Sequence, residues 1–397
     1  MKQLRIALMV LCTCIVGLMV QQYFFCPRYQ FNTATPFQGT IIRNPYELMN
    51  SKNWIKCNFH AHSKSWGGIT NGHGTARDVH QAYEKLHYGM HCVSNYHDID
   101  SSNIDSVNYL SAYEHGYNIQ KTHQLVLGSR HVVWLDYIFP QTTHNKQHLI
   151  QRLREANTVT ILNHPALRKG YTPEDLTLLT GYDCMEVLNP SATSTAEWDA
   201  ALSAGRTAFI AGDDDIHDVI AKKRLGTRCT FVNVTANSGD AVMQALKTGN
   251  SYGVIISETQ HYDSIPQLRS LTVNHDSIQI EMSAPAQCAS LTGQNGNVLH
   301  TIENTNRISY RIKPQDHYAR ATFKYSNGTT IFLNPVYYSS PIGAMIPPFH
   351  RKVNETTFFR ILGVCAMVLW IILCKWWLSP KPPRHKGWVK HTMMITF

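Results

Sequence analysis

Short apolar runs that end in polar side chains recur along the middle of the chain, and helical stretches separate them. The predicted strands cover residues 54–59, 91–97, 124–128, 158–163, 184–189 and 207–212. The predicted helices cover residues 76–86, 146–156, 195–204 and 240–248. Strands that alternate with helices indicate an α/β fold with a mostly parallel sheet and helices packed outside it.

The polar residues at the strand ends are of the kinds that bind metals. His60 and His62 follow the first strand, and side chains two residues apart point to the same side of an extended chain. Later strands lead to His97, His131, His164 and the run Asp215-Ile216-His217. If the sheet closes into a barrel, the carboxyl ends of the strands meet at one mouth, and these side chains converge there. The pattern therefore predicts a shared metal site.

The competing interpretation is that each histidine is an ordinary polar residue. The chain has 21 histidines, so some must be incidental. Those expected on the surface are His80, His87, His115, His123 and His148.

Four motifs, in this order, resemble the polymerase and histidinol phosphatase (PHP) superfamily. They are His60-Ala61-His62, His97, His164-Pro165 and Asp215-Ile216-His217, and the resemblance runs from about residue 58 to 219. It implies a distorted seven-stranded β/α barrel with a site for two or three divalent metal ions that hydrolyses phosphate esters. Imidazole and carboxylate ligands suit Zn, Mn or Fe.

The chain departs from the superfamily pattern in three places. His73-Gly74 stands where an Asp-Gly is common, and Tyr96 replaces the Asp expected before His97. The bridging Glu of the middle of the domain is not found; His131 is the preferred substitute, and Arg130 is the alternative. The predicted metal ligands are therefore His60, His62, His73, His97, His131, His164, Asp215 and His217.

The predicted catalytic residues are Asp215, His217 and Arg168. Asp215 is the expected acidic ligand, while His217 is either a ligand or the acid that protonates the leaving group. Arg168, with Lys169, either clamps the phosphoryl oxygens or lies on a solvated loop. Glu186 either orients a ligand or is buried for structural reasons. The expected substrate is a phosphorylated small molecule or lipid.

The net charge of +9 does not indicate a nucleic-acid partner. Seven of the positive charges lie at the two ends of the chain: Lys2, Arg5, Lys375, Lys381, Arg384, Lys386 and Lys390. The middle is nearly balanced, so it offers no basic surface for a polyanion.

Apolar runs at residues 6–20 and 358–378 predict a membrane-spanning segment at each end. For the first run, a cleaved signal peptide is the alternative to an anchor. Positive charges flank the outer end of each run, which predicts cytoplasmic termini and an extracytoplasmic catalytic region.

After residue 255 the pattern changes to period-two alternation, which predicts an antiparallel β-sandwich that packs, spaces or grips substrate. The expected organisation is an anchor at 1–27, the barrel at 40–255, the sandwich at 256–345, a transmembrane helix at 357–378 and a basic tail at 379–397. The sequence predicts a membrane-anchored metal-dependent phosphoesterase. The alternative is a degenerate PHP-like module that binds a metal or ligand without turnover in an envelope complex.

Overall fold

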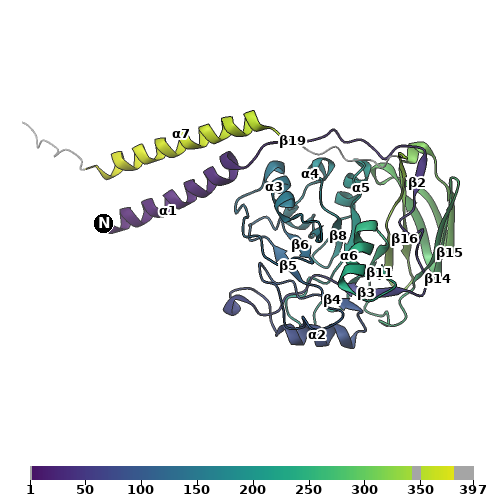
Figure 1. The fold of residues 1–397 in the computed structure, drawn as a ribbon. Helices are drawn as coiled ribbons and strands as arrows, with labels where there is room; N and C mark the ends of the chain where they lie inside the picture. Colours follow the sequence, from purple (N-terminus) through teal and green to yellow (C-terminus); the bar gives the residue numbers. More distant parts are fainter. Residues whose placement is uncertain (1, 342–349, 380–397) are drawn as a thin grey trace, which may run out of the picture. The chain divides into compact units, whose positions relative to one another are not determined.

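The structure, a computed structural model, describes residues 2–341 and 350–379, which divide into two compact units. One unit is Cys26–Val353, and the other combines the described parts of Met1–Phe25 and Asn354–Phe397. The predicted basic tail lies almost entirely outside the described residues. Figure 1 shows the course of the chain.

A six-stranded sheet in the larger unit carries much of the predicted α/β region. Its order is β10-β8-β7-β6-β5, with β9 paired to β8. The strands are β5 Ala112–His115, β6 Gln124–Leu127, β7 Val159–Leu162, β8 Cys184–Asn189, β9 Ala192–Thr193 and β10 Phe209–Gly212. Only the β7–β8 and β8–β10 ladders are parallel in this sheet; the β5–β6, β6–β7 and β8–β9 ladders are antiparallel. The expected mostly parallel sheet is thus a mixed one.

An eleven-stranded sheet forms the rest of this unit, in the order β13-β14-β16-β17-β12-β11-β3-β4, with β15, β18 and β2 branching from it. Its first members in the chain are β2 Ile41–Arg43, β3 Trp54–Asn58, β4 Met90–His91, β11 Arg228–Asn233 and β12 Ser251–Ile255. The others are β13 Leu268–Asn274, β14 Ser277–Thr292, β15 Val298–Arg311, β16 Tyr318–Lys324, β17 Thr330–Leu333 and β18 Val336–Ser339. A separate pair joins β1 Tyr29–Gln30 to β19 His350–Arg351.

The two sheets do not close into the predicted barrel. Between β10 and β11 no backbone ladder forms within the described chain; instead the Thr230 hydroxyl accepts from the Gly212 N–H at 2.9 Å and donates to its carbonyl oxygen at 3.0 Å. At the other edge, β5 meets the segment after β4 through a single bridge between Tyr96 and Glu114. A side chain in one seam and a lone bridge in the other leave the expected barrel open.

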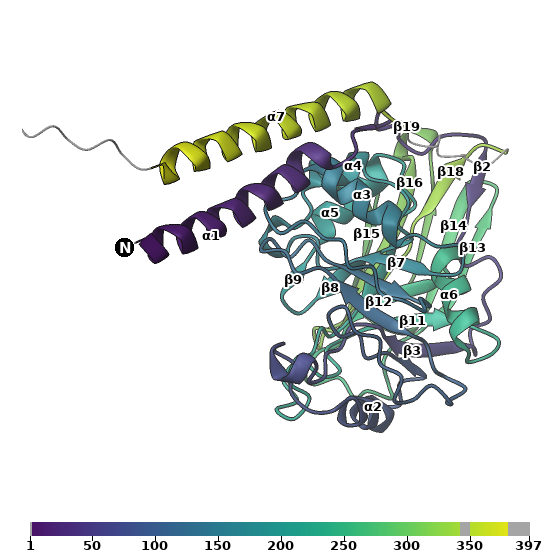
Figure 2. The ribbon, with the colours of Figure 1, turned by 60° about the vertical axis from the view of Figure 1, so that its left-hand side comes forward.

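The strands after residue 255 extend the second sheet rather than forming a separate sandwich. β17 pairs with β12, so this region continues the sheet that contains β3 and β11. A 3₁₀ turn at Gln294–Gly296 joins β14 to β15, and Asn327-Gly328 lies between β16 and β17. Figure 2 shows these long strands gathered at one end of the unit. The predicted domain boundary at residue 255 stays a prediction.

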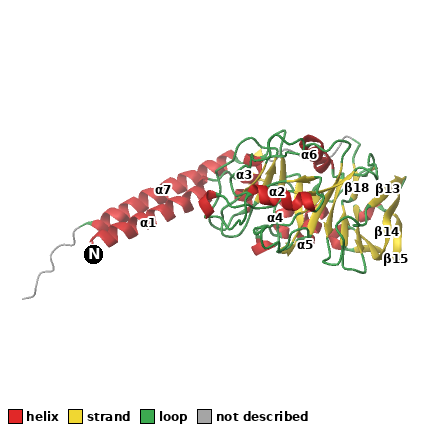
Figure 3. Ribbon diagram, turned by 90° about the horizontal axis from the view of Figure 1, so that it is seen from below, coloured by secondary structure: helices red, strands yellow, loops and turns green. Residues whose placement is uncertain are grey.

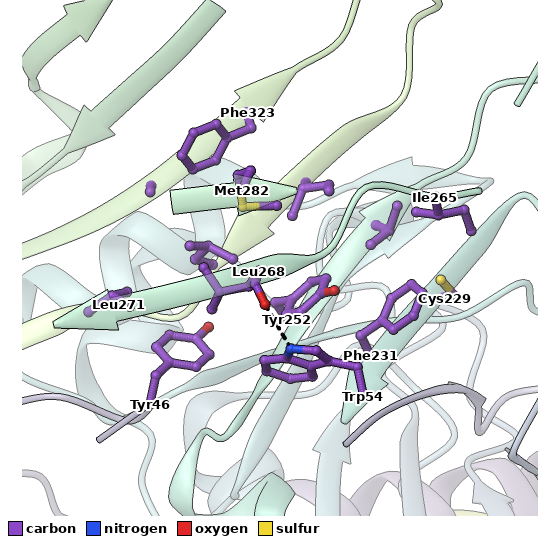
Figure 4. Packing of buried hydrophobic residues seen from close by; sticks show 14 of the residues in the cluster. Tyr46, Trp54, Cys229, Phe231, Tyr252, Ile265, Leu268, Leu271, Met282 and Phe323 are labelled. Atoms are coloured by element: carbon purple, nitrogen blue, oxygen red, sulfur yellow. Dashed lines mark hydrogen bonds between the residues drawn. The ribbon is translucent and has the colours of Figure 1, made fainter. Parts of the chain in front are cut away.

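A shared hydrophobic core crosses the same boundary. The Trp54 indole N–H donates to the Leu268 carbonyl oxygen at 2.9 Å, and its ring meets Tyr252 edge-on at 4.7 Å (Figure 4). Phe231 stacks on Tyr252 at 5.2 Å. Because β3, β11 and β12 bury their aromatic rings against β13, the early and late parts of the chain depend on each other for burial.

The helices of this unit are α2 Ala76–Lys85, α3 Thr143–Leu153, α4 Pro173–Leu178, α5 Thr195–Ser203 and α6 Gly239–Thr248. α2, α3 and α4 begin with reciprocal caps, in which a threonine hydroxyl accepts from the backbone N–H three residues on. The cap of Thr142 with Asn145 explains why α3 begins before its predicted start at residue 146.

In the other unit, α1 Lys2–Val20 continues into a π-helical turn, Gln21–Phe25, and pairs with α7 Val353–Leu378. Figures 2 and 3 show α1 and α7 side by side. The Trp370 indole donates to the Thr13 hydroxyl at 3.1 Å, while a Cβ at Gly363 would lie 2.8 Å from Phe24 Cβ. The pairing is therefore antiparallel and close. Gln3–Phe25 and Val353–Leu378 are long and apolar enough to cross a membrane, with mean hydropathies of 2.1 and 2.3. A signal sequence near the N-terminus can have the same length and composition.

Candidate metal centre

Strand ends from both sheets bring histidines and carboxylates to one buried point. His60 and His62 follow β3, Glu114 lies in β5, and His123 directly precedes β6. His164 follows β7, Glu186 lies in β8, and Asp215 and His217 follow β10. Among the described residues, four overlapping groups of three have ligand atoms within 4.8 Å of one another; their members are His60, His62, Glu114, His123, His164, Asp215 and His217.

Glu114 is the carboxylate at the middle of this centre. Its Oε2 lies 3.1 Å from His62 Nε2 and 3.4 Å from His60 Nε2. Its Oε1 lies 2.8 Å from His123 Nδ1 and 3.4 Å from His164 Nε2. Each oxygen thus faces a different pair of imidazoles.

Asp215 is the second carboxylate. Its Oδ1 lies 3.3 Å from His60 Nε2 and 3.4 Å from His217 Nδ1, and its Oδ2 accepts from the Asn189 amide at 3.2 Å. Asp215 and His164 both have a positive φ, 45° and 30° respectively. Non-glycine residues in this region are uncommon, and such strain clusters where a site requires a particular side-chain direction.

Glu186, Asp213 and Asp214 hold the ligands in place. Glu186 Oε1 lies 2.9 Å from His60 Nδ1, and its Oε2 accepts from the His164 backbone N–H at 2.8 Å. Asp213 Oδ1 accepts from the backbone N–H of Phe59, directly before His60. Asp214 accepts from the backbone N–H groups of residues 226–228. A carboxylate on the far nitrogen of a ligating histidine fixes the ring and its tautomer, so Glu186 orients His60.

Burial and neighbouring charges shift the pKa values of His60 and Glu114. Burial lowers the pKa of His60, but the carboxylates of Asp215, Glu114 and Glu186 outweigh it and raise that pKa well above its ordinary value. Burial raises the pKa of Glu114, yet His60 and His123 hold it well below its ordinary value. The Glu114 carboxylate therefore stays ionised and attracts positive charge.

The donor set fits a divalent metal ion. Glu114 Oε2 is buried and has no well-aligned hydrogen bond within the described residues, although two imidazole nitrogens lie within 3.4 Å of it. His60 Nε2 and His62 Nε2 lie 3.2 Å apart, within hydrogen-bond distance of each other and close enough to share one cation. Imidazole and carboxylate donors in this number suit Zn, Mn or Fe.

The structure brings together five of the predicted site residues: His60, His62, His164, Asp215 and His217. It does not bring His73, His97, His131 or Arg168 to them. The ring nitrogens of His97 are both engaged, Nδ1 at 3.1 Å from the Val133 carbonyl oxygen and Nε2 accepting from the Gly116 N–H at 3.0 Å. His131 is exposed and pairs with Glu155 at 3.1 Å.

The side chains of His73 and Arg168 also lie outside the centre. His73 is exposed and takes part in the centre only through its backbone N–H, which donates to the His217 carbonyl oxygen at 2.7 Å. The exposed Arg168 side chain donates to the Ile119 carbonyl oxygen at 3.3 Å. Two residues that were not predicted, Glu114 and His123, take the central places.

Of the five histidines expected on the surface, His80, His115 and His123 are buried, whereas His87 is exposed. Glu114 and His123 could have been predicted from the hairpin that carries them. Glu114 lies near the end of its first strand, before Gly116, and His123 comes directly before its second strand. Two of the four residues of β5, Glu114 and His115, are polar, so this segment lacks the apolar run by which the other strands were predicted.

A cavity of about 360 Å³ borders the centre, and its rim, the less buried part of its lining, carries three cations and one carboxylate, Asp218. Tyr96, His164, Asp215 and His217 line its floor side, and the cationic lining residues are Lys121, Lys223 and Arg224. Tyr96 stacks on the His62 ring at 4.6 Å, and burial, with Glu114 and Asp215 adding to it, raises the pKa of its phenol. Lys121 lies in one loop, and Lys223 and Arg224 are neighbours in another; the predicted Arg168 does not line the cavity.

Comparisons with known proteins give one distant likeness. No protein-family model matches the chain, and no curated protein matches it. A solved structure described as a two-domain protein containing a predicted PHP-like metal-dependent phosphoesterase, from Bacteroides vulgatus, is 13% identical, with a TM-score of 0.39. The match covers 81% of this chain and 99% of that one. A likeness this distant carries no assignment of function, which rests on the side chains of the site.

Proposed function

We propose that the protein is a membrane-anchored, metal-dependent phosphoesterase. The observation that carries this proposal is the meeting of His60, His62, His164, Glu114 and Asp215 beneath a cavity whose rim is basic. A divalent ion held by these residues supplies an activated water at neutral pH and positive charge for the phosphoryl oxygens. Glu114 and Asp215 provide the anionic ligands that hold such ions.

The residues around the cavity divide the remaining tasks. Lys223 and Arg224 offer positive charge and N–H donors to the outer oxygens of a phosphoryl group. The Tyr96 phenol keeps its proton at neutral pH and can donate a hydrogen bond to a substrate oxygen. Burial and the neighbouring His62 lower the pKa of His217 to about 4, so its ring is neutral at neutral pH. That favours the ligand role over the role of general acid for His217.

The alternative, a degenerate module without turnover, rests on the bridging Glu and the Asp before His97 that the sequence lacks at their usual places. Glu114 favours the enzyme over this alternative, since a buried carboxylate faces four imidazoles at the centre. The two apolar helices support the anchoring part of the proposal. Their antiparallel pairing fits termini on one side of a membrane, and we place the catalytic unit on the extracytoplasmic side.

The test is hydrolysis by purified full-length protein in detergent, stripped with a chelator and reloaded with Zn²⁺, Mn²⁺ or Fe²⁺. A phosphomonoester and a phosphodiester of nitrophenol serve as substrates. We expect metal-dependent release of nitrophenol from at least one. Protein that binds metal but hydrolyses neither substrate, nor any member of a phosphate-ester panel, would favour the module without turnover.

Lys223→Ala tests the rim, with Lys222→Ala as the matched control. Both lysines are exposed on the same loop, but only Lys223 lines the cavity. We expect Lys223→Ala to raise KM about tenfold, with a smaller change in kcat, because it removes a contact to substrate. Lys222→Ala should leave both constants near the wild-type values; equal effects of the two variants would remove Lys223 from the site.

A further inference from the structure

A second, smaller cavity lies apart from the metal centre. It has a volume of about 70 Å³, and none of its lining residues lines the larger cavity. His80 on α2, His91 on β4 and Asp100 on the following loop face it, together with Glu84 and Tyr109. The polar groups of this lining, rather than the volume of the cavity, indicate that a ligand binds there.

Three imidazole nitrogens in this lining have no hydrogen-bond partner within the described part of the chain. They are Nδ1 of His80 and both ring nitrogens of His91, and all three atoms are buried. His80 as a whole is 9% exposed, and its ring centroid lies 5.1 Å from that of His91. A buried polar atom left without a partner costs about 1–3 kcal/mol, so three of them together indicate that something satisfies them.

Asp100 sets the direction in which His80 can act. Its Oδ2 lies 3.0 Å from His80 Nε2, so that nitrogen carries the proton and donates a hydrogen bond to the carboxylate. Asp100 is itself held by the Ser102 hydroxyl at 2.9 Å, and its carbonyl oxygen accepts from the Tyr109 hydroxyl at 2.8 Å. In the neutral ring the lone pair is then on Nδ1. A histidine whose far nitrogen donates to a fixed carboxylate is the usual form of a metal ligand.

We propose that this cavity is a second metal site, which holds one transition-metal ion of the zinc type. His80 Nδ1 and a ring nitrogen of His91 are its protein ligands, and solvent takes the remaining positions. Two imidazole donors favour Zn²⁺ or Co²⁺ over Ca²⁺ or Mg²⁺, which prefer oxygen. The ion connects α2 and β4, and through Asp100 it also secures residues 98–110, which form neither α-helix nor β-strand.

The test counts metal ions per chain in full-length protein in detergent, titrated with Zn²⁺ after chelation. We expect His91→Gln and His80→Gln each to bind one equivalent fewer than the wild type. His87→Gln is the matched control, because His87 also pairs with an aspartate, Asp263 at 2.8 Å, but is exposed. It should bind as the wild type does. Equal stoichiometry in all four proteins would overturn the proposal and leave the cavity to water.

A second measurement does not depend on how the variants fold. Crystals of the wild-type protein soaked in Zn²⁺ should show an anomalous peak between His80 and His91, separate from any peak at Glu114. No peak there at saturating Zn²⁺ would overturn the second site. Because the two positions are read separately, failure of the second site and failure of the main centre can be told apart.

Discussion

At the scale of single residues, burial decides which histidines can carry a proton. His97 is 6% exposed, and its Nε2 accepts from the Gly116 N–H, a bond that only an unprotonated nitrogen can accept. Burial, and after it His115, lowers the pKa of His97 to about 4. His97 therefore belongs to the stability of the fold around the centre rather than to its ligand set.

This shift predicts a loss of stability in acid. The pKa of His97 is about 4 in the folded chain and near 6.5 in the unfolded chain, so the unfolded chain binds the proton first. The stability that neutral His97 contributes is fully present above pH 6.5 and is lost as the pH falls toward 4. By pH 4.5 about 2 kcal/mol of it is lost. Denaturant unfolding of metal-stripped protein should show a shallower acid loss in His97→Gln than in the wild type.

The exposed His131 provides the control for that comparison. His131→Gln should keep the acid loss of the wild type, because its side chain is 66% exposed. If His97→Gln and the wild type lose stability in parallel between pH 7.5 and 4.5, the neutral state of His97 is not what links stability to pH.

His97 also shows why the sequence predicted some residues of the site correctly and others wrongly. His60, His62, His164, Asp215 and His217 follow regular strands or a recognisable motif, and the structure brings them together. His97 was predicted at the end of a strand over residues 91–97, but β4 ends at His91, and the backbone after it turns the His97 ring to Val133. Whether a histidine at a strand end faces inward depends on local backbone course, which a motif does not encode.

At the scale of elements, apolar runs could be predicted as strands, whereas a strand with polar residues could not. β3, β7, β8 and β10 lie within their predicted ranges, and α2, α5 and α6 begin and end within about one residue of theirs. β5 was missed because its four residues, Ala112–His115, include two polar ones buried by the centre itself. The hairpin after it also requires Gly116, at φ 130°, where a Cβ would lie 2.4 Å from the His123 ring.

The open barrel has the same kind of cause. Closure depends on backbone pairing between β10 and β11, and the Thr230 hydroxyl takes the place of that pairing. The late strands were predicted as strands but placed in a separate sandwich, because alternation reveals which face is buried and not which sheet a strand joins. Pairing partners far apart in the sequence are tertiary facts.

At the scale of the whole molecule, α1 and α7 predict that both termini lie on one side of a membrane. The antiparallel contacts Thr13–Trp370 and Gly363–Phe24 place their outer ends together. Protease added to intact cells should cut within residues 30–353 and spare an epitope fused after Phe397. Degradation of the epitope with the catalytic unit would mean that α7 does not span.

The central claim is that Glu114 completes a metal centre, and the metal content of one variant tests it most directly. Glu114→Gln is compared with Glu155→Gln, since both glutamates pair with histidine but Glu155 is exposed. His91→Gln serves as the common background, so that the second cavity does not contribute. Elemental analysis after dialysis against limiting Zn²⁺ should show at least a tenfold weaker retention in Glu114→Gln, with Glu155→Gln unchanged. Equal metal in both variants would contradict the account.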